Sequence, residues 1–164
     1  MSLLNKVFKG HNSHRVTFSQ PEAIAAIAIS AIASDGYLLN IETERVITLL
    51  SQMEMFKGYS EKQITTLLDK LLNMLSEKGI NNLVAIANEA LHPEYKETAF
   101  TLATDIILVD GVLSGKEQVF LTRLCQVLEV PTEIASQIFQ AQSGNNQVTK
   151  KKSRKYKNNQ HYEK

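Results

Sequence analysis

The chain has 164 residues, and its 43% hydrophobic content is ordinary for a soluble protein. This length predicts one domain with a sizeable core, and the single cysteine excludes an internal disulfide and fits a reducing cytosol. No apolar run reaches the roughly 20 residues that a transmembrane helix needs, and residues 1–10 lack the features of a cleavable signal peptide. We therefore expect a cytoplasmic protein.

The net charge of +1 hides an uneven distribution. Residues 150–164 hold seven of the 18 basic residues and one of the 17 acidic ones, which leaves 11 basic and 16 acidic residues and a net charge of −5 elsewhere. Residues 143–164 also lack apolar periodicity, so we predict a basic tail that is disordered in isolation. Such a tail could solubilise the chain. It could also make weak contacts with anionic lipid or nonspecific contacts with nucleic acid, because no sequence-reading motif accompanies it.

Helical periodicity dominates the chain between a polar lead-in, residues 1–20, and the tail. Pro21 fits the first turn of a helix, and Ser60 and Ser114 each precede Gln or Glu by three residues, which is the pattern of a capping box. Glycines and Pro93 mark the breaks between helices. Together these signals predict an all-α bundle of about seven helices, over about 21–34, 41–55, 60–77, 82–91, 94–109, 114–129 and 131–142.

One sequence pattern occurs twice in this helical region. Residues 35–42 (DGYLLNIE) and 110–117 (DGVLSGKE) lie 75 residues apart and share Asp, Gly, Leu and Glu at the same spacing. The same offset pairs further residues, namely Glu22 with Glu97, Ala28 with Ala103, Ile32 with Ile107, Leu49 with Leu124 and Glu54 with Glu129. A fixed-offset repeat predicts two similar units, about 21–78 and 96–142, related by an approximate two-fold pseudosymmetry within one domain of residues 21–142.

The repeated pattern Asp-Gly-x-Leu-x-x-x-Glu is the second half of an EF-hand calcium loop. Positions one and three of such a loop would fall on Ala31 and Ala33 in the first copy, and on Ile106 and Leu108 in the second. Apolar side chains cannot coordinate a hard cation, so two ordinary EF-hands are excluded. What remains is a helix, a glycine turn and a second helix, with carboxylates near the corner.

One interpretation of these corners is a metal site. If the pseudosymmetry brings the corners together, their carboxylates converge, and hard oxygen ligands favour Ca²⁺, Mg²⁺ or Mn²⁺ over Zn²⁺. Glu42 keeps its spacing although Leu39 replaces the capping serine found in the second copy, which favours a role beyond capping. The candidate ligands are Asp35, Glu42, Asp110 and Glu117, with Glu44 and Asp105 as secondary acids.

The other interpretation is purely structural. Gly36 and Gly111 would only end their helices, the neighbouring aspartates would only bond the turn backbone, and Glu117 would only complete a capping box. The chain would then be a helical scaffold for protein interactions. We expect no enzyme, because the sequence has no phosphate-binding glycine loop, no nucleophile elbow and no zinc-spaced cluster, and Cys125 lies on an apolar helix face.

The segment Ala33-Ser34-Asp35-Gly36, repeated as Val109-Asp110-Gly111, resembles the tellurite-resistance TerB family, and so does the opening segment 1–7. The resemblance covers about residues 1–142. It implies an all-helical fold shared with the N-terminal region of a membrane-anchored DnaJ-type co-chaperone, and a role in tellurite and stress resistance. It also implies metal chelation by acidic residues, and action at the inner face of the cytoplasmic membrane with a membrane-spanning protein partner.

Residue by residue, the resemblance carries over the two aspartates and their glycines: Asp35, Gly36, Asp110 and Gly111. Family members often place glutamates closer to the glycine than this chain does. Lys116 also adds a positive charge to the second corner, which weakens the metal interpretation there.

Overall fold

The computed structural model describes residues 16–36 and 40–144, and for residues 40–42 it describes the backbone alone. This part of the chain is all-α and has no strand, as the sequence predicts. The α-helices are α2 (Gln20–Ala33), α3 (Asn40–Ser51), α4 (Glu61–Lys78), α5 (Ile80–Ala90), α6 (Lys96–Ile107), α7 (Gly115–Val127) and a helix over residues 132–144. Three single 3₁₀ turns lie between them, η1 (Glu54–Phe56), η2 (Pro93–Tyr95) and η3 (Leu108–Asp110). Most of the predicted lead-in and tail lies outside the described residues.

Helix α2 forms the centre of the bundle. Its residues 23–32 are all buried, and it packs against α3, α4, α5 and α6. Five alanines in this run let neighbouring helices approach closely, and the four isoleucines among them fill the space. The one polar residue in this run, Ser30, donates its hydroxyl proton to the Ala26 carbonyl oxygen at 2.8 Å. Helix α2 is therefore buried on most sides.

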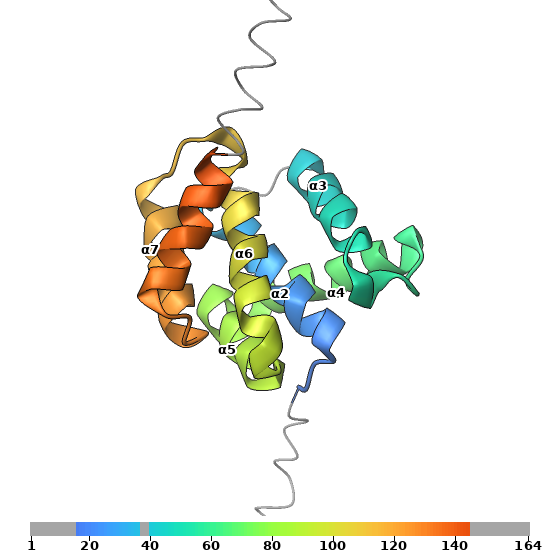
Figure 1. The fold of residues 1–164 in the computed structure, drawn as a ribbon. Coiled ribbons are helices and arrows are strands. Elements are labelled where there is room, and N and C mark those ends of the chain that lie inside the picture. Colours follow the sequence, from blue (N-terminus) through green and yellow to red (C-terminus); the bar gives the residue numbers. More distant parts are fainter. Residues whose placement is uncertain (1–15, 37–39, 145–164) are drawn as a thin grey trace, which may run out of the picture.

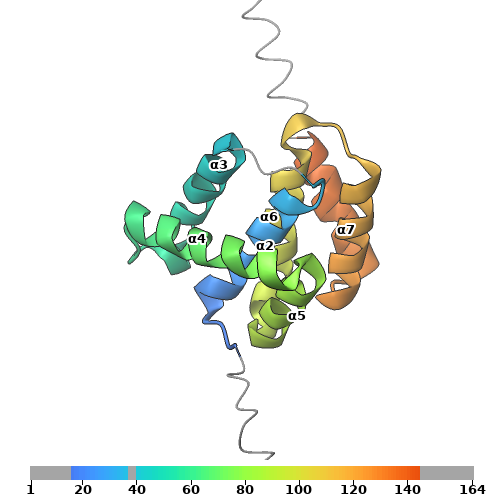
Figure 2. The ribbon, with the colours of Figure 1, turned by 180° about the vertical axis from the view of Figure 1, so that it is seen from behind.

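The two repeated units have matching elements. In the first unit α2 leads through a glycine turn to α3, and in the second α6 leads through a glycine turn to α7. Gly36 has φ of 91° and Gly111 has φ of 69°, so both predicted hinges have a left-handed backbone that favours glycine. Helix α6 lies against α2 on one side (Figure 1), and α4 crosses α2 on the opposite side (Figure 2).

Capping boxes fix the starts of three helices. Ser60 with Gln63 begins α4 and Ser114 with Glu117 begins α7, as predicted. A third box, Ser19 with Glu22, begins α2 and was not predicted. In each box the serine oxygen accepts from a first-turn N–H group and the Glu or Gln side chain accepts from the serine N–H group, so two exposed helix donors are satisfied.

The predicted second helix, 41–55, is too long, because α3 ends at Ser51. The Ser51 hydroxyl donates to the Thr48 carbonyl oxygen at 2.8 Å, which competes with continuation of the helix. The following turn η1 then brings Phe56, only 1% exposed, into the core beside the Tyr59 ring. The predicted helix 94–109 is also too long, because α6 spans only Lys96–Ile107 and the turns η2 and η3 occupy the two ends of the predicted range.

Candidate functional site

The two Asp-Gly corners meet in space. Asp35, from the end of α2, and Asp110 and Glu117, from the second corner, line one cavity of about 60 Å³. Arg45 of α3 lines the same cavity, and the remaining wall is apolar side chains of α2 and α6 and the turn that follows. Carboxylates about 75 residues apart in the sequence are therefore gathered at one place.

Arg45 is the residue of this site that the sequence analysis did not identify. Its Nη2 lies 3.6 Å from Oδ2 of Asp105 on α6, so the ion pair joins the two repeated units. Its Nε atom is buried and has no hydrogen-bond partner among the described residues. Arg45 is three residues after Glu42, and this helical spacing was the available signal. The guanidinium supplies a positive charge to a corner that otherwise gathers acids.

Glu117 has a capping role that the structure shows directly. Its Oε1 accepts from the Ser114 N–H group at 2.9 Å, and the Ser114 hydroxyl oxygen accepts from the Glu117 N–H group at 3.2 Å. The same side chain also lines the corner cavity. Capping and lining of the cavity are therefore compatible functions of one carboxylate.

The two secondary acids are not among the residues that line the corner cavity. Asp105 pairs with Arg45, and Glu44 is exposed. Among the described side chains, no three His, Cys, Asp or Glu residues are grouped closely enough to hold a metal ion. The side chain of Glu42 is outside the described set, so the four-carboxylate metal site stays a prediction.

The fold and site define a class of protein: an all-α bundle with two similar halves, whose helix hinges gather acidic side chains at one corner. Residues 21–140 match the family described as Tellurite resistance protein TerB, and the chain belongs to this family. The resemblance seen in the sequence is thereby confirmed. No curated protein and no solved structure matches the chain. Among the described residues, no helix combines the length and the apolarity that crossing a membrane requires.

Proposed function

We propose that this TerB family member acts without catalysis, by binding a divalent cation where its two Asp-Gly corners meet. The observation that supports this proposal is the corner cavity, which Asp35, Asp110 and Glu117 line together. Three carboxylates and one guanidinium line this cavity, so its described side chains carry a net negative charge that favours a cation. A bound Ca²⁺, Mg²⁺ or Mn²⁺ would do so with the oxygen ligands that these ions prefer.

The three described carboxylates do not fit a cation by themselves, since they form no metal-holding group. The proposal therefore requires a further ligand, and Glu42 is the candidate because α3 begins at the first corner. Arg45 lines the same cavity and its charge would oppose a bound cation, so the proposal also requires that its guanidinium stay paired with Asp105. Both requirements can be tested with single substitutions.

Calorimetric titration of Ca²⁺, Mg²⁺, Mn²⁺ and Zn²⁺ tests the proposal. We expect wild type to bind at least one of the three hard ions more tightly than Zn²⁺, and Asp35→Asn/Asp110→Asn and Glu42→Gln each to lose that binding. Arg45→Gln should bind more tightly, because a competing positive charge is gone. Asp69→Asn, which removes an exposed acid of α4, is the matched control and should bind as wild type does. Absence of binding by wild type would overturn the proposal.

A second candidate is a protein-interaction scaffold whose corners are structural. Arg45 favours it, because this side chain already supplies a positive charge beside the corner carboxylates. In that case calorimetry would give no metal binding, and Arg45→Gln would lower the free energy of unfolding instead of raising cation affinity.

We further propose, from the family membership and not from the site, that the chain contributes to tellurite resistance at the inner face of the cytoplasmic membrane with a membrane-spanning partner. In a strain whose tellurite resistance depends on this protein, the Asp35→Asn/Asp110→Asn variant should fail to restore growth on tellurite while being produced at the wild-type level. Full restoration of growth by this variant would show that tellurite resistance does not depend on the corner carboxylates.

A further inference from the structure

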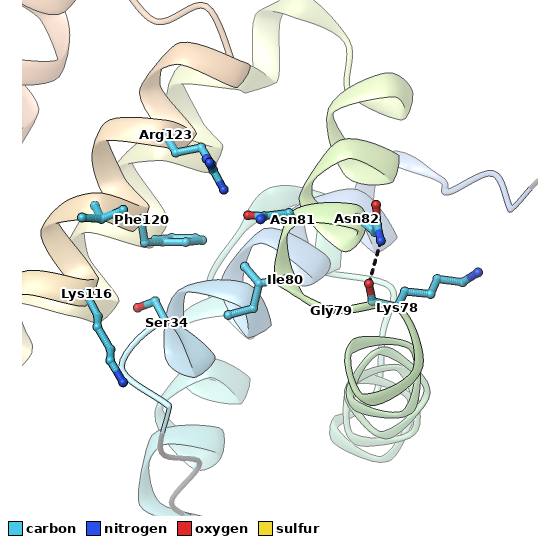
Figure 3. Close-up of a pocket in the computed structure, with 10 residues that line it drawn as sticks. Ser34, Lys78, Gly79, Ile80, Asn81, Asn82, Lys116, Phe120 and Arg123 are labelled. Atoms are coloured by element: carbon cyan, nitrogen blue, oxygen red, sulfur yellow. Dashed lines mark hydrogen bonds between the residues drawn. The ribbon is translucent and has the colours of Figure 1, made fainter.

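A second and larger cavity, of about 410 Å³, lies between the C-terminal end of α2, the N-terminal end of α5 and one face of α7 (Figure 3). It shares no lining residue with the corner cavity. Its volume is within the range of about 300–1,000 Å³ that is typical of small-molecule sites. The side chains that α7 contributes are Lys116, Val119, Phe120 and Arg123.

Among the described residues that line this cavity, the charged side chains are all cationic. Arg123 points from α7 toward the first turn of α5, Lys116 flanks the cavity beside Ser34, and Lys78 directs its ammonium group away from it (Figure 3). No Asp or Glu is among the described residues that line the cavity. Within the described part of the chain, neither Arg123 nor Lys116 takes part in an ion pair. Their charges are therefore available to an anion.

The first turn of α5 adds backbone donors to these cations. Gly79 is its N-cap residue, with φ of 82° and no side-chain cap, and the first turn contains no acidic residue. The first N–H groups of a helix have no acceptor within the helix and carry the positive end of its dipole. Helices α2, α4 and α7 satisfy such donors with capping boxes, and α5 does not. Asn82 donates its side-chain NH2 group to the Lys78 carbonyl oxygen at 2.8 Å, and among the described residues no side chain caps the start of α5.

The cavity also has an apolar wall. Ile80 and Phe120 line it, and Val119 is 66% exposed at its edge, one of two large hydrophobic side chains that stand out as exposed among the described residues. A ligand whose apolar part covers Val119 would remove this surface from water, which is favourable. The ligand that complements this cavity therefore has an anionic group and an apolar part.

We propose that this cavity binds a small phosphomonoester that has an apolar body. The phosphate would lie between the Arg123 guanidinium and the N–H groups at the start of α5, with Lys116 adding a longer-range attraction. Guanidinium and helix N-termini are both favoured partners of phosphate oxygens. The apolar body would lie against Phe120 and Val119. The cavity is partly open to solvent, and its volume is in the range typical of small-molecule sites.

Titration of the full chain with phenyl phosphate, followed by backbone amide NMR, tests the proposal. We expect the amide signals of residues 80–82 to shift with saturation. Inorganic phosphate should cause the same pattern at higher concentration because it lacks the ring, and phenol should leave these signals unchanged because it lacks the charge. Phenol that shifts residues 80–82 as strongly as phenyl phosphate, or phenyl phosphate that shifts only signals elsewhere, would overturn the proposal.

Two charge-removing variants complete the experiment. Arg123→Gln should weaken phenyl phosphate binding roughly 10- to 100-fold, as expected for the loss of charge-assisted hydrogen bonds. Arg123 is exposed and forms no ion pair among the described residues, so the variant should fold normally. Lys62→Gln removes an exposed cation of α4 outside the cavity and should bind as wild type does. Equal losses in the two variants, or tetraglutamate binding more tightly than phenyl phosphate, would contradict a phosphate site.

Discussion

The two Asp-Gly corners share a sequence pattern but differ in what surrounds them. At the first corner Asp35 is half-buried, and Arg45 follows ten residues later on α3; at the second, Asp110 is exposed and a capping box begins α7. At the 75-residue offset, the position of Arg45 is taken by Phe120, and that of Asp105 by Ser30. The equivalent positions, Phe120 and Ser30, therefore cannot form an ion pair like the one between Arg45 and Asp105. The two copies of the repeat therefore share the glycine hinge but differ in the side chains that surround it.

This difference separates two kinds of cavity in one pseudosymmetric fold. Arg45 lines the small cavity with the carboxylates, whereas Phe120 lines the larger cavity with the cations. Equivalent positions thus serve an acidic site in one half and a basic, apolar one in the other. Four pairs of substitutions, each comparing equivalent or matched positions, test how far the halves differ.

The largest difference is expected in the core, at equivalent positions of α2 and α6. Ile27 is fully buried and Leu102 is 8% exposed. We expect Ile27→Ala to lower the free energy of unfolding by about 4 kcal/mol and Leu102→Ala by about 2–3 kcal/mol, because the cavity left in α2 is enclosed on more sides. Urea unfolding of both variants measures the difference. A larger loss for Leu102→Ala would show that α2 is not the central helix of the core.

Substitutions of the two hinge glycines should lower the free energy of unfolding less than the core substitutions do, and by different amounts at the two hinges. Gly36→Ala should cost roughly 2 kcal/mol and Gly111→Ala roughly 1 kcal/mol, because φ of 69° is closer than 91° to the left-handed well that other residues can adopt. A β-carbon on Gly36 would lie 4.0 Å from Lys116 Nζ, an ordinary contact, so the cost is in the backbone. Thermal unfolding checks the order. Gly111→Asn is the control and should be milder than Gly111→Ala, since asparagine tolerates this conformation.

The capping box of the second corner should contribute about 1 kcal/mol. Ser114→Ala removes the acceptor for the Glu117 N–H group and should lower stability by that amount. Gln126→Ala, at an exposed position of the same helix, is the matched control and should change stability little. If both variants unfold at the same urea concentration as wild type, the box does not contribute to stability.

The smallest expected effect is the pH dependence of stability that Glu22 causes. Glu97 is at the equivalent position of the second unit. Burial raises the pKa of Glu22, but hydrogen bonds from the Ser19 N–H group at 3.2 Å and from Lys70 at 3.1 Å outweigh it, so its pKa is below the ordinary 4.5. A lowered pKa means that the folded state favours the carboxylate. The resulting stability is present above the unfolded value of 4.5 and is lost as pH falls through the lower folded value.

We therefore expect Glu22→Gln to be less stable than wild type at pH 7 and to lose less stability than wild type between pH 5 and pH 3. Glu97→Gln, at the equivalent position of α6 and without an ion pair among the described residues, is the matched control. Parallel curves for wild type and Glu22→Gln would contradict this role of Glu22.

The sequence predicted those parts of the molecule that depend on local chemistry. The capping serines Ser60 and Ser114 and the hinge glycines fix helix ends within a few residues, and the structure has each of them as predicted. Arg45 could not be placed in this way, because its partner Asp105 is 60 residues away and meets it only after α3 and α6 pack. The larger cavity could not be predicted for the same reason. In the sequence Arg123 resembles any solvent-exposed cation of a helix, because the uncapped start of α5 lies opposite it only in the folded chain.

The burial of α2 also has a consequence for synthesis of the chain. This helix emerges from the ribosome before α5 and α6, yet it packs against both of them. Helices α3 and α4 can cover only part of its alanine and isoleucine surface, and the rest stays uncovered until residue 107 has been made, so the first repeated unit cannot complete its core as an independent folding unit. The nascent N-terminal half is accordingly the stage at which this protein most needs protection from aggregation.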